Sequence, residues 1–186
     1  MIVLYMTMSL DGFVVGPDDS REQPMGRGGF RLFNWLDDRE SDGPSGQVYR
    51  EAMSTGAVIA GRRTFEHAGR WQGDHHDGVP IYILTHTVDE NDIPPGSARF
   101  VTDVADCAAQ AKAAAGDRNV MVHGAGAAQS LLRAGLLDEL ELHVVNVLLG
   151  QGRRLFDGLP AEPIELEQVR HLIDRDVAHL HYRVVR

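Results

Sequence analysis

Short apolar runs alternate with helical patterns along most of this chain, and that alternation is what most constrains its fold. Runs that suit buried strands occupy residues 2–8, 57–60, 80–84, 119–123 and 140–149, with a further edge strand near 99–101. Helices are predicted at 44–55, in a short segment after Gly61, from a cap at Asp103 to Gly116, and at 127–134. Because strands separated by helices pair in parallel, we expect an α/β fold with a mostly parallel central sheet.

The last part of the chain has a different pattern. Residues 165–173 and 177–185 alternate between apolar and polar side chains and are joined by Asp174-Arg175-Asp176. Such a pair predicts an antiparallel hairpin at one edge of the sheet. The 186 residues, 43% of them apolar, contain no internal repeat or linker, so we expect one domain over residues 1–186.

Charge and hydropathy exclude several classes of partner. The formal net charge is -9 and the basic residues are scattered, so nucleic acid and anionic membranes would be repelled. No run approaches the roughly 18 to 20 apolar residues that span a bilayer, and residues 1–8 read as a strand and not as a signal peptide. Cys107 is the only cysteine, which fits a reducing cytoplasm. We expect a cytoplasmic protein with a small-molecule substrate, no nucleic-acid partner and no membrane association.

The segment from Gly16 to Pro44 carries most of the turn-forming residues around one apolar cluster. That cluster contains Phe30, Leu32, Phe33, Trp35 and Leu36. Loops of this length are unusual in a compact domain unless they bind something. The segment is therefore predicted to be a long loop with one helical turn that forms a rim or lid over a binding site; a disordered surface loop is the alternative.

Two junctions between a strand and a helix are marked by glycine and could each hold an anion. At Gly61-Arg62-Arg63-Thr64, a phosphate could approach the backbone while the hydroxyl and the two guanidinium groups donate to it. A solvated start of a helix is an equally good interpretation of the arginine pair. At His123-Gly124-Ala125-Gly126-Ala127, small residues leave room for a pyrophosphate, but Gln129 stands where the Rossmann fingerprint needs a small residue. Two separate anion sites suggest a ligand with two phosphate clusters.

The ordered motifs resemble those of the dihydrofolate reductase superfamily. They are Ser9-Leu10-Asp11-Gly12 after the first strand, Val58 to Phe65, Ile83-Leu84-Thr85, Val122 to Gly126, Leu137 to Leu140, and Gly152 with Leu155-Phe156. The pattern is most similar to the branch that includes the C-terminal reductase domain of bacterial riboflavin biosynthesis enzymes. The resemblance covers nearly the whole chain and implies the three-layer fold of dihydrofolate reductase, with the antiparallel hairpin at the C-terminus.

The resemblance also implies a cofactor, NADPH, and the residues that would bind it. Gly61, Arg62, Arg63 and Thr64 would hold the pyrophosphate and the ribose 2′-phosphate, and Thr85 and His86 would lie beside the adenosine. Gly124, Ala125, Gly126 and Ala127 would wrap the pyrophosphate, and the loop from Leu10 to Val15 would cover the nicotinamide.

The substrate side departs from the family. Ser45 stands where dihydrofolate reductases carry a carboxylate that grips the pteridine, so folate is not the expected substrate. The candidate catalytic groups for the proton that accompanies hydride transfer are Asp42, Asp11 and water held by Ser45. The other interpretation, which the residue types favour, is that Asp42 is a helix cap and Asp11 a turn former. Phe33, Trp35 and Tyr49 could stack on a flat heterocycle or pack in the core.

A cluster at His75-His76-Asp77 resembles a metal site, but adjacent histidines are expected to point apart and no second ligand group has suitable spacing, so no metal site is predicted. The leading hypothesis is an NADPH-dependent reductase of a small, flat, pteridine-like or pyrimidine-like substrate. The alternative is a non-catalytic nucleotide-binding or ligand-sequestering homodimer. The resemblance suggests a homodimer through the C-terminal strands in either case.

Overall fold

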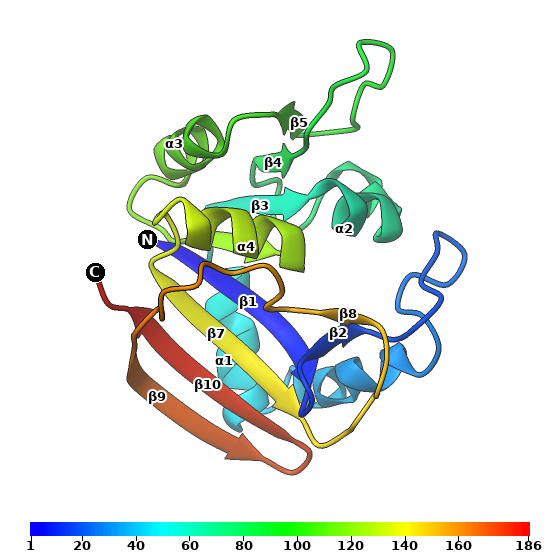
Figure 1. Cartoon of the computed structure of the whole chain (residues 1–186), viewed down its shortest axis with the longest axis vertical. Helices are drawn as coiled ribbons and strands as arrows, with labels where there is room; N and C mark the ends of the chain where they lie inside the picture. The colour runs from blue at the N-terminus through cyan, green and yellow to red at the C-terminus, as the bar shows by residue number, and fades with distance from the viewer.

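An eight-stranded sheet runs through the whole molecule, and the computed structural model describes all residues, 1–186 (Figure 1). The strands are β1 (Ile2–Ser9), β2 (Phe13–Val15), β3 (Ala57–Gly61), β4 (Ile81–Leu84), β5 (Ala98–Val101), β6 (Val120–His123), β7 (Glu139–Val145), β8 (Arg153–Arg154), β9 (Leu166–Asp174) and β10 (Val177–Val184). The helices are η1 (Gly29–Asp38), α1 (Pro44–Met53), α2 (Arg62–His67), η2 (Gly69–Gly73), α3 (Val104–Ala115) and α4 (Ala125–Arg133), where η marks a 3₁₀ helix.

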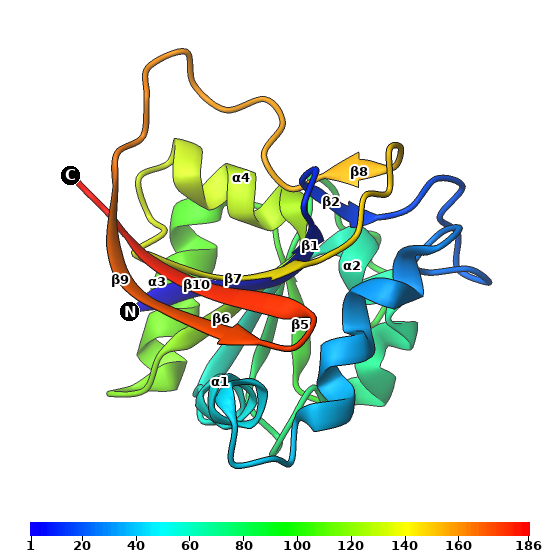
Figure 2. The same ribbon diagram turned by 90° about the horizontal axis from the view of Figure 1, so that it is seen from below.

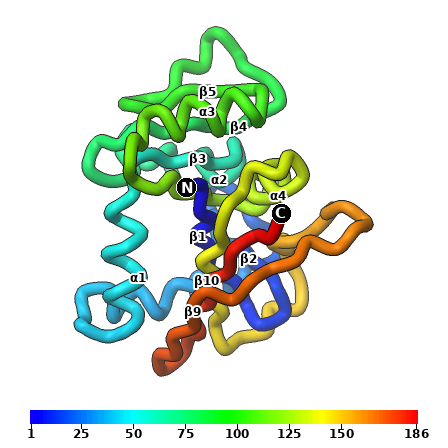
Figure 3. Tube along the Cα trace, turned by 90° about the vertical axis from the view of Figure 1, so that its left-hand side faces the viewer, coloured from blue at the N-terminus to red at the C-terminus, as the bar shows by residue number.

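The order of strands confirms the mostly parallel sheet with an antiparallel end. The large sheet runs β5-β4-β3-β6-β1-β7-β10-β9, and β2 pairs with β8 in a separate small sheet. All pairs from β5 to β7 are parallel, whereas β10 pairs antiparallel with both β7 and β9. Figure 3 shows β4 and β5 at one end of the molecule and the β9–β10 hairpin at the other.

Helices cover both faces of the parallel strands, which explains why those strands read as continuous apolar runs. In Figure 2 the sheet is seen between α3 and α4 on one side and α1 on the other. Along β1, Ile2 and Leu4 belong to the core under α3 and α4, while Val3 and Tyr5 belong to the core that also contains Ala52 of α1. None of the helices combines the length and the apolar character that crossing a membrane requires.

Two boundaries differ from the sequence prediction for local reasons. The strand expected over 140–149 ends at Val145, because the N–H groups of Leu149 and Gly150 donate to the carboxylate of Asp11 instead of extending a ladder. The helix expected from residue 127 begins at Ala125, because the whole turn is made at Gly124, whose φ is +92°.

The long segment before α1 contains more structure than the single helical turn that was predicted. Residues 29–38 form η1, and its Leu32 and Trp35 are buried against Val48, Val145 and Val177. Phe30 and Phe33 of the same helix remain exposed. The apolar cluster therefore serves partly as a third small core and partly as surface.

Candidate functional site

A large cleft opens where the parallel strands end, at the edge of the sheet from which α2 and α4 begin. Its volume is about 1180 Å³. Both glycine-marked junctions belong to its wall. All ten residues predicted to contact a cofactor line it: Gly61, Arg62, Arg63, Thr64, Thr85, His86, Gly124, Ala125, Gly126 and Ala127.

The two junctions are in contact with each other. A side chain on Gly124 would collide with the hydroxyl of Thr64, and a Cβ on Gly61 would lie 3.6 Å from the backbone N of Ala127. Since α4 begins directly after Gly124, its first N–H groups have no partner within the helix and face this junction. The arrangement brings backbone donors, a hydroxyl and the partial positive end of a helix dipole to one place, which suits a pyrophosphate.

Both arginines of the first junction already pair with carboxylates. Arg62 donates to Glu66 Oε1 at 3.0 Å and to Asp92, and its guanidinium stacks on Phe100 at 4.2 Å from the ring centre. Arg63 Nε donates to Asp19 Oδ2 at 2.8 Å.

Asp19 lies in the long loop, and its carboxylate is close to three basic side chains in the cleft. Its carboxylate lies 3.5 Å from His67 and 3.9 Å from Arg153, besides Arg63. Burial raises the pKa of Asp19, but the hydrogen bond and charge of Arg63, with Arg153 and His67, outweigh it and leave that pKa below its usual value. The carboxylate of Asp19 therefore lies among basic side chains that would also attract a phosphate.

One end of the cleft, beyond the first junction, is made by β4, β5 and the start of α3. Thr85, His86, Thr102 and Asp103 line it. The carboxylate of Asp103 caps α3 by accepting the N–H of Asp106 at 2.8 Å. This end offers small polar groups and one negative charge.

The other end is aromatic and apolar. Phe33, Trp35 and Tyr49, which the sequence analysis selected as stacking candidates, all line it, together with Tyr5 and Trp71. Trp71 reaches the cleft from η2, where Arg70, Trp71 and Gln72 all have left-handed backbone conformations. Of the loop predicted to cover the nicotinamide, Val14 and Val15 line the cleft, but residues 10–13 do not.

Three histidines line the aromatic end and are neutral at pH 7. Burial lowers the pKa of His75 to about 2 and that of His123 to about 4, and it lowers that of His143 well below its usual value. The expectation that His75 and His76 point apart was wrong, because their Nδ1 atoms lie 2.7 Å from each other. No group of three His, Cys, Asp or Glu side chains has an arrangement that could hold a metal ion.

The three candidate proton donors lie outside the cleft. Asp11 is held in a turn, where the hydroxyl of Ser9 and the N–H groups of Leu149 and Gly150 lower its pKa to about 2. Asp42 is exposed and does not cap α1, because Gly43 occupies the cap position. Ser45 is buried, and its hydroxyl donates to Asp174 at 2.7 Å.

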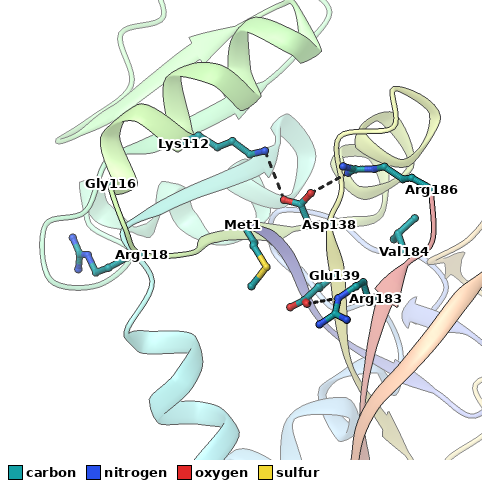
Figure 4. Close-up of a pocket in the computed structure, with 9 residues that line it drawn as sticks. All are labelled: Met1, Lys112, Gly116, Arg118, Asp138, Glu139, Arg183, Val184 and Arg186. Atoms are coloured by element: carbon teal, nitrogen blue, oxygen red, sulfur yellow. Dashed lines mark hydrogen bonds and ion pairs between the residues drawn. The ribbon is translucent and has the colours of Figure 1, made fainter.

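A second hollow of about 500 Å³ lies at the opposite ends of the strands, near Met1 (Figure 4). Its side chains pair with one another: Lys112 and Arg186 with Asp138, and Arg183 with Glu139. It contains neither glycine junction and no aromatic side chain. The first cleft is therefore the candidate site.

The sequence model of one family, the RibD C-terminal domain, matches residues 1–179. The chain belongs to this family. A search of curated protein sequences finds no match.

Several solved structures align with this chain and have a similar fold. A protein from Shewanella sp. PV-4 described as a riboflavin biosynthesis protein aligns with a TM-score of 0.74 and 19% identity, covering 99% of this chain and 98% of the other. A Thermotoga maritima deaminase and 5-amino-6-(5-phosphoribosylamino)uracil reductase aligns with a TM-score of 0.65 and 13% identity over 100% of this chain and 56% of the other. Dihydrofolate reductase from Enterococcus faecalis, solved with NADP(H), gives 0.61 and 12% over 100% and 97%. These identities establish the fold alone.

Several lining residues of this RibD C-terminal domain protein had no distinctive signal in the sequence. Asp19, Arg153 and Trp71 lie in segments that read as loops, and His143 looks like one of several isolated histidines on strands. Only the resemblance of neighbouring motifs could have placed Arg153, which follows Gly152. The other three reach the cleft through contacts between distant segments.

Proposed function

We propose that this protein is an NADPH-dependent reductase that transfers a hydride to a small, flat heterocycle of the pteridine or pyrimidine kind. The observation that carries the proposal is that a single cleft has both glycine-marked junctions in its middle and an aromatic, apolar chamber at one end. The family and the fold support a reductase-type function.

The residues of the cleft fit the cofactor. A Cβ on Gly126 would meet no protein atom within 4 Å, so this glycine leaves room for a ligand, and the N-terminus of α4 with Thr64 would hold the pyrophosphate. Arg63 and Arg153 would donate to phosphate oxygens after their ion pairs with Asp19 break. When bound, NADPH supplies the hydride, and the aromatic chamber beside it would hold the substrate against the nicotinamide.

An alternative function, non-catalytic binding of a nucleotide or sequestering of a ligand, has one observation in its favour. The only carboxylates that line the cleft are Asp19, which pairs with Arg63, and Asp103, which caps α3. Neither lies at the aromatic end, so the proton for a reduction would have to come from water or from a neutral side chain. Turnover of a substrate distinguishes the two functions.

The first test is a titration of the protein with NADPH and with NADH, followed by the fluorescence of the reduced nicotinamide. We expect saturable binding of NADPH, and a loss of about 10-fold or more when Arg62 and Arg63 are both replaced by alanine, because hydrogen bonds to charged groups contribute about 1.5–3 kcal/mol. NADH, which lacks the 2′-phosphate, should lose less.

Arg118→Ala, in the second hollow, is the matched control and should leave both affinities unchanged. If NADPH does not bind saturably, both functions are wrong. If the double variant loses NADPH and NADH equally, the two arginines only begin a helix. Oxidation of bound NADPH by pterins, quinones and aminopyrimidine sugars then tests for turnover.

We further propose a cytoplasmic homodimer that forms through the C-terminal strands. The lone Cys107 is buried, which fits a reducing compartment. The edge strand β9 leaves Leu166, Val169 and Ile173 exposed, and an exposed apolar edge strand can pair with a second chain.

A further inference from the structure

A buried chain of hydrogen bonds leads from the tip of the β9–β10 hairpin to the aromatic end of the cleft. It starts at Asp174, whose Oδ2 lies 2.7 Å from Ser45 Oγ, and Ser45 Oγ lies 3.3 Å from His179 Nε2. His179 Nδ1 lies 2.9 Å from Nδ1 of His143, which lines the cleft. Ser45, His179 and His143 are at most 4% exposed, so water does not compete along the chain.

The carboxylate of Asp174, at the outer end of this chain, determines the direction of each hydrogen bond in it. Asp174 accepts from the N–H groups of Ser45 and Arg175, and a carboxylate can only accept, so the hydroxyl proton of Ser45 points toward it. Ser45 Oγ then accepts from His179, which places the proton of His179 on Nε2. His179 Nδ1 is left as an acceptor, and the proton of His143 must lie on Nδ1.

This order leaves Nε2 of His143 as an acceptor with a free lone pair. The buried side-chain atoms without a partner are Glu141 Oε1 and Arg170 Nε, so Nε2 of His143, which makes no hydrogen bond within the protein, is open to the cleft. Trp35 packs on both rings, at 4.5 Å from His143 and 5.1 Å from His179, and its Nε1 is tied to Thr7. The rings are thus held in place from the side of η1.

Both rings of the chain are neutral. Burial lowers the pKa of both histidines. The charged groups that act on them are Asp174, Glu141 and Arg170, and Glu141 and Arg170 pair with each other at 3.1 Å. Each neutral ring carries one N–H, and the chain of hydrogen bonds that starts at Asp174 determines which nitrogen carries it.

We propose that His143 is a specificity-determining residue: its Nε2 accepts a hydrogen bond from an N–H group of a heterocyclic substrate, and the Asp174–Ser45–His179 chain fixes it as an acceptor. The inference rests on the proposed function and narrows its substrates to heterocycles that present an N–H group to the wall of the cleft. A ring that presents only acceptors there would leave two lone pairs facing each other.

The tautomers are measured directly by ¹⁵N NMR of the full-length protein labelled at histidine, without any ligand. We expect His143 protonated on Nδ1 and His179 on Nε2. Asp174→Asn replaces an acceptor by a group that can donate to Ser45, so it should shift the chain toward the opposite tautomers. Asp176→Asn, in the same turn, makes no contact with the chain and should change neither ring. A wild-type His143 protonated on Nε2, or on both nitrogens, overturns the inference.

The second test is calorimetric binding of 5,6-diaminouracil to the NADPH-saturated protein. His143→Phe keeps a ring in place but removes the acceptor, and should weaken this binding by about 10-fold, with Ser45→Ala weaker in effect and NADPH affinity unchanged in both. His171→Phe, at an exposed position on β9 outside the cleft, is the control.

The outcomes separate this inference from the proposed function. Failure of wild-type protein to bind NADPH contradicts the function, while the NMR result still decides the order of the chain. Normal NADPH binding together with no binding of 5,6-diaminouracil, or with unchanged binding in His143→Phe, contradicts the role of His143. If His143→Phe does not fold, His143→Leu, which also lacks an acceptor, replaces it in the same two titrations.

Discussion

Under the proposed function, Asp19 would compete with the cofactor for the basic side chains of the cleft. Its carboxylate lies where Arg63, His67 and Arg153 converge, so a phosphate bound there would have to displace it. We expect Asp19→Asn to strengthen NADPH binding by about 2- to 5-fold, because an ion pair whose arginine is 50% exposed contributes about 1 kcal/mol or less. The measurement is the NADPH titration at low and at high salt, where the gain should shrink as salt rises.

Asp18→Asn is the control for that experiment, because Asp18 is 70% exposed and pairs only with Arg27. If Asp19→Asn weakens NADPH binding instead, Asp19 serves to order the loop around the cofactor and does not compete with it.

The contacts that decide the chemistry of this cleft join residues far apart in the sequence. Asp19 and Arg63 are 44 positions apart, and Ser45 and Asp174 are 129 apart. No local pattern encodes such pairs. Gly124 is different, because its neighbours predict a tight turn before a helix, and the structure gives it the left-handed conformation that favours glycine. Residues with a backbone role were therefore easier to predict than residues with a side-chain partner.

The residue that caps helix α3, Asp103, affects both the stability of the helix and the charge of the cleft. Asp103 accepts the N–H of Asp106 and also lines the end of the cleft beyond the first junction. We expect Asp103→Ala to cost about 1 kcal/mol of unfolding free energy, which lowers the Tm by about 2–4 °C in a chain of this size. Asp103→Asn caps equally well and should leave the Tm unchanged, as thermal unfolding by circular dichroism can measure.

The same pair of variants separates capping from electrostatics. Because Asn removes the negative charge but keeps the cap, NADPH should bind to Asp103→Asn at least as tightly as to the wild type. Equal losses of Tm in both variants would show that the charge of Asp103, and not its cap, stabilises α3.

Elements with a clear start signal were predicted best. The Asp103 cap and Gly116 bracket α3, and Pro44 begins α1, as the sequence indicated. By contrast, η2 bends through three non-glycine residues in left-handed conformations, Arg70 to Gln72. Non-glycine residues rarely adopt that conformation, so nothing in the sequence predicts it, and the position of Trp71 in the cleft could not be foreseen.

At the scale of the molecule, the alternation of strands and helices predicted the parallel sheet and the hairpin at its end. The sequence could not predict how deep the cleft is, because its depth depends on η1 and on the loop before it, which fold over the ends of the strands. The hairpin has a second consequence. It makes β9 the outermost strand of the sheet, and β9 is left with apolar side chains in solvent.

We expect a second copy of the chain to cover that edge, since a nine-residue strand with exposed apolar residues invites association. Light scattering should then give twice the 20.5 kDa of one chain. Val169→Glu places a charge in the middle of β9 and should yield monomers. Val88→Glu is the matched control, since Val88 is 48% exposed and Val169 45%, but Val88 lies outside the hairpin and should leave the dimer intact. A wild-type protein that is monomeric at micromolar concentration contradicts the proposal, and so does a dimer that Val169→Glu leaves unchanged.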